Sequence, residues 1–110
     1  MPLLRNADRA IIEEQKLRDY LLNPDHERNN GKWRLFAALG YTQRNWERMA
    51  EDLREQHHTQ ECEFSRVTVH GDNYTIVAWL QGPLGSANIE SVWQFDLGSD
   101  VPRLISAYGG

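Results

Sequence analysis

The last third of the chain carries the pattern that most limits its fold. From Ala87 to Asp96, apolar and polar residues alternate, and this period of two is typical of a strand with one buried face. The turn residues LGSDVP follow, and a shorter alternating segment covers Arg103–Tyr108. Strands joined by such a short connection pair antiparallel. The sequence therefore predicts a hairpin within a sheet, against which the rest of the chain must pack.

Two more alternating segments precede this hairpin, over Phe64–His70 and Tyr74–Gln81. The residues GDN join these two segments, and GPLGS connects the second one to Ala87–Asp96. Both connections contain residues that tolerate a positive φ, as hairpin turns require. Short connections favour antiparallel neighbours, so we expect a four-stranded meander.

Three segments with helical spacing occupy the first half of the chain. The first covers roughly Asp8 to Leu22 and ends before Pro24, because the residue before a proline is disfavoured in a helix. The second covers Lys32–Leu39 and is followed by Gly40, a residue type that often ends helices. Thr42 is the expected N-cap of the third helix, which has one apolar and one charged face.

These elements predict a single α+β domain over residues 1–110. Two to three N-terminal helices, within about residues 8–58, are expected to pack on one face of a four-stranded antiparallel sheet formed by about residues 62–108. A chain of 110 residues can bury one hydrophobic core and is too short for two.

The composition limits the compartment and the partners. A net charge of -4 and a pI near 5.5 argue against nucleic-acid binding by bulk electrostatics, whereas a local basic site is still allowed. The single cysteine, Cys62, cannot form an internal disulfide, which fits a reducing compartment. No segment reaches the roughly 20 apolar residues of a membrane span, and the N-terminus has no apolar run of signal-peptide length. We expect a cytoplasmic protein without a membrane partner.

The sequence contains none of the common motifs for metal or nucleotide chemistry. It has no Walker-type glycine loop, no HExxH, no CxxC, no GxSxG and no dinucleotide fingerprint. We therefore expect neither a metal nor a cofactor. General acid–base chemistry by His, Lys, Arg, Tyr and Ser is still allowed, and these are the residue types used in metal-independent RNA cleavage.

The histidines differ in their surroundings along the sequence. His57 and His58 end a charged helix and are expected to be exposed to solvent. His26 lies in a polar loop, with Arg28 and Lys32 nearby, where a side chain can reach a cleft. Simple exposure of a loop histidine is the ordinary alternative.

The last predicted strand carries Arg103, Ser106 and Tyr108. Strict alternation places Ser106 and Tyr108 on one face and Arg103 on the opposite face. Structural roles also explain these residues: Tyr108 can cover the sheet edge and Arg103 can pair with an acidic neighbour. In the same way, Trp93 is equally suited to the core.

A family of uncharacterised bacterial domains resembles three stretches of the chain, KLRDYLLNPDH, GKWRLFAALGY and SVWQFDLGSDVPRLISAY. The family pattern runs KLxxYLL, a His, a Lys before an aromatic-rich turn and LGF/Y, then TVW and PRLVTAYP. The match extends from Lys16 to Tyr108. The chain differs in having Ser91 and Ser106 where the pattern has Thr, and Gly109 where it has Pro.

The resemblance implies a toxin-type protein of bacterial conflict systems, with a small cognate protein as a partner. The order of helices and strands is also similar to that of the barnase, EndoU, colicin and RelE-like ribonucleases. On this basis we expect RNA as the substrate, cleaved at the 2′-OH without a metal. Carried onto this sequence, the expected catalytic residues are His26, Lys32, Arg103, Tyr108 and Ser106, and the expected substrate-binding residues are Trp93, Ser91 and Arg28.

Two other functions stay open on the sequence alone. A non-enzymatic interaction module, such as the neutralising partner of a toxin, is favoured by the acidic charge and by the 4 Trp and 4 Tyr residues, which suit interfaces. A domain that binds a small metabolite is a third reading, and no particular residue supports it.

Overall fold

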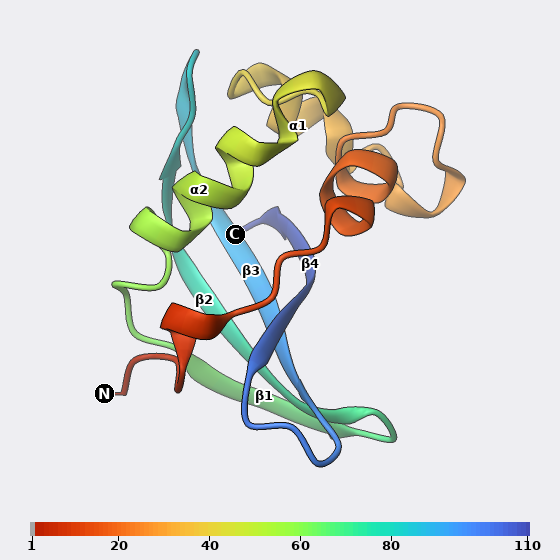
Figure 1. The fold of residues 1–110 in the computed structure, drawn as a ribbon. Helices are drawn as coiled ribbons and strands as arrows, with labels where there is room; N and C mark the ends of the chain where they lie inside the picture. Colours follow the sequence, from red (N-terminus) through yellow and green to blue (C-terminus); the bar gives the residue numbers. More distant parts are fainter. Residues whose placement is uncertain (1) are drawn as a thin grey trace.

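The chain forms one four-stranded antiparallel sheet in the order β1-β2-β3-β4, as the sequence predicts. A computed structural model describes residues 2–110 (Figure 1). The strands cover Glu63–Thr68 (β1), Gly71–Gln81 (β2), Ser86–Asp96 (β3) and Pro102–Gly109 (β4). Sequential strands are neighbours throughout, so the sheet is a meander.

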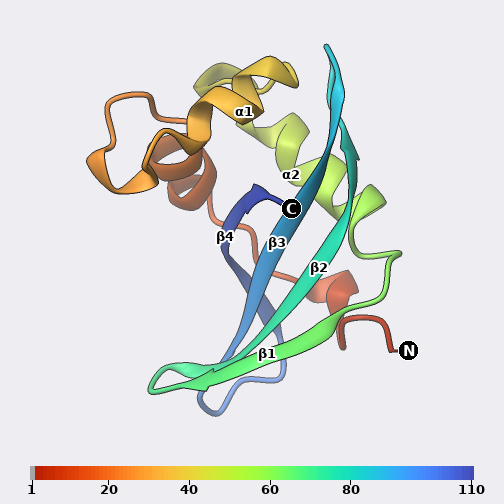
Figure 2. The same ribbon diagram turned by 180° about the vertical axis from the view of Figure 1, so that it is seen from behind.

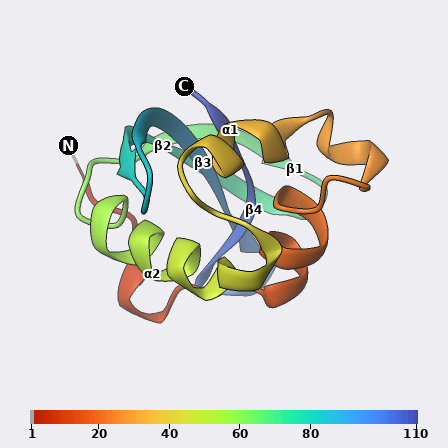
Figure 3. The same ribbon diagram turned by 90° about the horizontal axis from the view of Figure 1, so that it is seen from above.

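Helices precede the strands, which confirms the predicted α+β class. Besides the two α-helices, the first half holds one short π-helix and three 3₁₀ turns. Their bounds are Lys32–Ala38 (α1), Trp46–Gln56 (α2), Gln15–Leu21 (η2, the π-helix), Ala7–Arg9 (η1), Glu27–Asn29 (η3) and Gln43–Asn45 (η4). Seen from above, α2 lies along one face of the sheet (Figure 3), and seen from behind, the strands lie in front of it (Figure 2). None of the helices within residues 2–110 has the length and apolar character needed to cross a membrane.

The core lies between this helical layer and the inner face of the sheet. Met49 and Leu53 of α2 have no exposed area, and neither do Ile76 and Leu80 of β2. Met49 and Leu53 are four residues apart, so they lie on the same face of the helix, which faces the sheet. Alternate residues of β2 point inward, and Ile76 and Leu80 belong to this set. Burial of these apolar surfaces fixes which face of each element points inward.

The first predicted helix begins later than expected. Instead of a helix from Asp8, residues around Ile11 are extended and pair in parallel with β4 at Arg103. The Ile11 amide donates to the Pro102 carbonyl at 2.8 Å, and the Ile11 carbonyl accepts from the Leu104 amide at 2.9 Å. This pairing satisfies backbone groups along the edge of β4, and it overrides the helical pattern of the surrounding residues.

The turn of the first hairpin also differs from the prediction. Thr68 pairs directly with Gly71, so Val69 and His70 form the turn, and the predicted GDN turn belongs to β2. Gly71 has a φ of 143°, and an added Cβ would collide with the carbonyl of Phe95 on β3. The glycine therefore serves the close approach of two strands.

A β-bulge interrupts the pairing of β3 with β4. Val92 pairs with Ser106, but the next residue, Trp93, pairs with Leu104. Ile105 is thus the extra residue on β4. An inserted residue reverses the inward and outward sense of the strand beyond it.

The bulge gives the two halves of β4 a common outer face. Arg103 pairs with Gln94, Ser106 pairs with Val92, and Tyr108 pairs with Glu90. All three partners on β3 lie at outward positions. The prediction that Arg103 and Tyr108 lie on opposite faces is therefore wrong, because strict alternation does not survive the bulge.

Candidate functional site

Lys32 lies at the centre of the polar side chains that the fold brings together. Its Nζ donates to Tyr20 Oη at 3.0 Å and to Ser106 Oγ at 3.4 Å. The same nitrogen lies 5.4 Å from the ring centroid of Tyr20 and 5.8 Å from that of Tyr108. These residues come from η2, the first turn of α1, and β4, so three separate parts of the chain meet here.

The ammonium of Lys32 has no ion-pair partner within residues 2–110. Its hydrogen-bond acceptors are neutral hydroxyls, and its cation–π neighbours are aromatic rings. The positive charge is therefore not neutralised by a neighbouring carboxylate. A partly buried ammonium in such surroundings attracts an anion.

His26 joins this group through Tyr20. The two rings meet edge to face, with centroids 5.1 Å apart. His26 Nδ1 accepts a hydrogen bond from the Arg28 backbone amide at 3.1 Å, which places the proton of the neutral ring on Nε2. The Nε2–H makes no hydrogen bond within the described residues and can donate one to a ligand, whereas proton uptake at Nε2 requires the Arg28 amide to release Nδ1. We call Tyr20, His26, Lys32, Ser106 and Tyr108 the Tyr20 cluster.

Asn29 fixes the loop that carries His26. Its side chain is 1% exposed, and its Nδ2 donates to the carbonyls of Tyr20 at 2.9 Å and Asn23 at 2.6 Å. Its Oδ1 accepts from the Gly31 amide at 2.9 Å. A buried, fully bonded carboxamide holds a loop in one conformation. This role of Asn29 was not predictable from the residue type, because Asn is common in exposed loops as well.

Tyr108 shares its hydroxyl proton with Glu90, its cross-strand partner. Oη donates to Glu90 Oε2 at 2.5 Å. This hydrogen bond, together with burial, raises the pKa of Tyr108 to about 12. The phenol is therefore neutral at physiological pH and its proton is directed at Glu90. Glu90 was missed as a site residue because it looked like one of the polar residues of an alternating strand.

A hollow on the outer face of the sheet adjoins the Tyr20 cluster. All four strands contribute to this hollow, and Ser106 and Tyr108 belong both to its lining and to the Tyr20 cluster. The lining residues are Ser65, Arg66, Asn73, Thr75, Val92, Ile105, Ser106 and Tyr108. We call it the outer-face hollow. The charge of Arg66 acts to lower the pKa of Tyr108, so this second cation faces the same site.

Arg103 has different surroundings from Lys32. Its guanidinium makes two hydrogen bonds to Asp96, at 2.9 and 3.0 Å, and lies 3.5 Å from Glu13. The pair with Arg103 lowers the pKa of Asp96 to about 2. Arg103 lines a second hollow together with Tyr20, so it borders the Tyr20 cluster. Unlike Lys32, its positive charge is already neutralised by two carboxylates, those of Asp96 and Glu13. This is the acidic pairing that the sequence left open.

Two of the residues expected to bind substrate lie in the core. Trp93 and Ser91 have no exposed area, so neither contacts a ligand in this conformation. Trp93 Nε1 donates to Ser91 Oγ at 2.8 Å, and this oxygen lies 2.7 Å from His57 Nδ1. The ordinary structural alternative for Trp93 therefore fits its position. Arg28, the third residue of that group, is exposed in the loop beside His26.

The expected exposure of His57 and His58 is wrong. His57 is completely buried, and His58 packs edge to face on Trp93 with ring centroids 4.5 Å apart. Burial lowers the pKa of each imidazole to about 4. The helix end thus turns its two histidines into the core, next to Ser91 and Trp93, where they are neutral at physiological pH.

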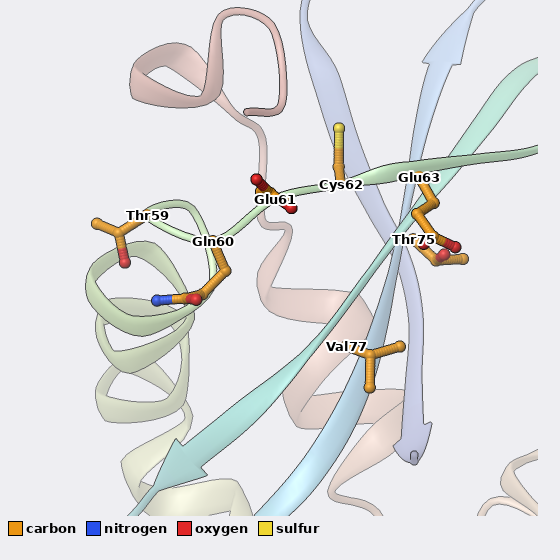
Figure 4. A pocket seen from close by; sticks show the side chains of 7 residues that line it. All are labelled: Thr59, Gln60, Glu61, Cys62, Glu63, Thr75 and Val77. Carbon is orange, nitrogen blue, oxygen red and sulfur yellow. The ribbon is translucent and has the colours of Figure 1, made fainter. Parts of the chain in front are cut away.

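Another hollow lies between the end of α2 and the outer face of β2 (Figure 4). Its polar side chains include Glu61 and Glu63, and Cys62 points away from Val77. Burial raises the pKa of the Cys62 thiol, which keeps it in the unreactive protonated form. No imidazole or cationic side chain lines this hollow within residues 2–110, so it lacks the cation beside an imidazole that the Tyr20 cluster provides.

Comparisons with known proteins identify a family for this chain but no characterised relative. A family model described as a domain of unknown function (DUF6883) matches residues 3–110, which is nearly the whole chain. No curated protein and no solved structure matches. Across residues 2–110 the side chains also form no group of three or more His, Cys, Asp or Glu residues placed to hold a metal ion.

Proposed function

The chain belongs to this family of domains of unknown function, and from the geometry of the Tyr20 cluster we propose that it is a metal-independent ribonuclease. The observation that carries the proposal is the position of Lys32. Within residues 2–110 its ammonium has no carboxylate partner, lies within hydrogen-bonding distance of two hydroxyls, and contacts the same Tyr20 as the imidazole of His26. A cation, hydroxyl donors and a proton-transfer group in one place are the parts that RNA cleavage requires.

RNA supplies its own nucleophile, the 2′-OH, so the protein has three tasks. It must take the 2′ proton, protonate the leaving 5′ oxygen, and stabilise the negative charge that develops on the phosphate. Attack forms the bond between the 2′ oxygen and phosphorus and breaks the bond to the 5′ oxygen. The products are a 2′,3′-cyclic phosphate and a free 5′-OH.

His26 and Lys32 are suited to two of these tasks, proton transfer and stabilisation of the charge on the phosphate. The Nε2–H of His26 has no hydrogen-bond partner among the described residues, so it can donate a hydrogen bond to the substrate. To transfer a proton at Nε2, the ring would carry a proton on Nδ1, and the Arg28 amide would have to release that nitrogen. Lys32, held by Tyr20 and Ser106, would contact the scissile phosphate. Tyr108 stays neutral and donates its hydroxyl proton to Glu90, so its oxygen would accept the 2′ proton of the substrate while Glu90 takes the phenol proton.

Arg103 enters the proposal as a positioning residue. Both of its acidic neighbours would have to release it before it could hold a phosphate. In its observed place it supports the outer face of β4, from which Ser106 and Tyr108 project. This differs from the catalytic role that was expected for Arg103 from the family resemblance.

The experiment is a cleavage assay with purified protein, tRNA and excess EDTA. We expect His26→Ala and Lys32→Met to lose roughly 10²- to 10⁴-fold in rate, the range for acid–base and charge-stabilising groups. His70→Ala and Arg44→Met are matched controls, because these exposed residues lie on a turn and a helical segment outside the cluster. Wild-type protein that leaves tRNA and total RNA intact would contradict the proposal.

A second function, binding of a small cognate protein, has its own supporting observation. The edge strand β1 exposes Phe64 (55%) and Val67 (71%), and β1 pairs only with β2 within residues 2–110. Exposed apolar side chains beside a free strand edge are suited to pairing with a strand of another protein. Expression in bacteria separates the functions, because a ribonuclease toxin slows growth whereas a neutralising partner does not.

A further inference from the structure

The side chain of Asn73, at the floor of the outer-face hollow, has an unsatisfied polar atom. Asn73 is 3% exposed, and its Oδ1 is buried without a hydrogen-bond partner among the described residues. It lies on β2 between Arg66 of β1 and Gln94 of β3. Buried carboxamides are almost always bonded, so an unpartnered one calls for an explanation. Asn29 is buried to nearly the same extent, but both polar atoms of its side chain are hydrogen-bonded.

The walls of the hollow suit a flat ring with polar edges. Val92, on the neighbouring strand, and Ile105, the bulge residue, supply apolar surface. Arg66 contributes a guanidinium without an ion pair within residues 2–110, and Ser106 also bonds to Lys32. The hollow therefore extends directly from the cation of the Tyr20 cluster.

We propose that the outer-face hollow is a nucleobase subsite in which the Asn73 carboxamide reads the edge of the base. A carboxamide presents an acceptor beside a donor, and nucleobases carry the complementary donor and acceptor on their edges. The apolar surface of Val92 and Ile105 would contact the face of the ring. This inference rests on the proposed function, because it places the phosphate of the same nucleotide near Lys32.

The base subsite explains why Asn stands at this position. Buried residues of a sheet that only fill space are apolar, and a Leu of similar size would remove the unsatisfied oxygen. Substitution of Asn73 by Leu is thus expected to leave the melting temperature unchanged or to raise it. A residue that reduces stability and lines a hollow is typical of binding sites.

The test is an NMR titration with ligands that the protein cannot cleave. The ligands are the four ribonucleoside 3′-monophosphates, with inorganic phosphate as the base-free reference. We expect at least one nucleotide to bind about 10-fold more tightly than phosphate, as a bidentate amide–base contact allows. The side-chain NH₂ signals of Asn73 should shift with that nucleotide and not with phosphate.

Variants test whether Asn73 causes the tighter binding of the nucleotide relative to phosphate. Asn73→Leu should reduce nucleotide affinity to the phosphate level while leaving phosphate binding intact, and Lys32→Met should weaken both ligands. Asn88→Leu is the matched control, since this exposed asparagine lies on β3 outside the hollow. The melting temperature of each variant shows whether it is folded.

The outcomes separate the subsite from the ribonuclease. Equal affinity for nucleotides and phosphate, or a gain that survives Asn73→Leu, overturns the base subsite even if RNA is cleaved. A gain that depends on Asn73, in a protein that leaves RNA intact, supports the subsite and contradicts the ribonuclease. Absence of both binding gain and cleavage contradicts both.

Discussion

Lys32 Nζ lies 3.0 Å from Tyr20 Oη, a hydrogen bond that ties the first turn of α1 to η2. The two residues are separated by the loop that carries His26, so the bond closes the base of this loop. It also orients the one cation of the cluster that points at Ser106. The function proposed for this chain depends on that orientation.

Tyr20→Phe tests the orientation of Lys32 directly. The variant keeps the ring that packs on His26 and loses only the hydroxyl. We expect the cleavage rate to fall by about 10-fold, the effect of one hydrogen bond worth roughly 1.4 kcal/mol, with the free energy of unfolding changed by less than about 1 kcal/mol. Single-turnover cleavage of tRNA and urea denaturation measure the two quantities. An unchanged rate would show that the hydroxyl does not position the lysine.

Tyr41→Phe is the matched control, and it is expected to lower stability without changing the cleavage rate. Tyr41 is 1% exposed and its hydroxyl donates to buried Asp52 at 2.6 Å, and neither residue belongs to the Tyr20 cluster. Removal of the hydroxyl leaves Asp52 with Arg48 as its remaining side-chain partner. We expect unfolding to become easier by about 1–3 kcal/mol, without a change in cleavage rate when the assay is run well below the melting temperature. A selective loss of cleavage would contradict this assignment.

His57 predicts how stability depends on pH. Burial lowers its pKa from 6.5 to about 4, so the unfolded chain binds a proton at a higher pH than the folded one. The free energy of unfolding should therefore be constant above pH 6.5 and fall as the pH drops toward 4, by about 3 kcal/mol for this group. Urea denaturation at pH 7.5 and pH 4.5 measures the change.

His57→Asn supplies the variant for that experiment. Asparagine can still bond to Ser91 but does not titrate, so it should reduce the pH dependence of the unfolding free energy between pH 6.5 and 4. His70→Asn, at an exposed turn, should retain it. His58 shares the low pKa and contributes to the same pH range, so some slope should persist in His57→Asn. The same slope in both variants would rule out His57 as a source.

Arg103→Gln distinguishes a positioning role from a phosphate clamp. Loss of the pairs with Asp96 and Glu13 should reduce stability by about 1 kcal/mol, because these side chains are partly exposed. The cleavage rate should fall far less than in Lys32→Met, and mainly through kcat. A large increase in KM for RNA would instead assign Arg103 to substrate binding.

The sequence carried enough information to predict the class and the order of the elements. The alternation over Ala87–Asp96 and the short connections determine a meander, because each strand must bury one face. The starting point of the first helix was not predictable in the same way. Ile11 is extended only because the edge of β4 is there to pair with it.

The site was less predictable because its geometry depends on contacts between distant parts of the chain. A one-residue bulge at Ile105 decides that Arg103 and Tyr108 share a face, and alternating residues alone do not reveal it. The burial of His57 depends on Ser91, 34 residues away. Tyr20 resembled one more apolar position of a helix, although its hydroxyl and ring connect Lys32 to His26.

The most direct test of the account is the chemistry of the RNA ends. Purified protein is incubated with a short RNA in excess EDTA, beside the same oligonucleotide with a 2′-deoxy residue at the cleaved position, and the products are analysed by mass spectrometry. We predict a 2′,3′-cyclic phosphate and a 5′-OH from the RNA, no cleavage of the deoxy analogue, and loss of both products in His26→Ala. Intact RNA, or equal cleavage of the deoxy analogue, would contradict the ribonuclease assignment.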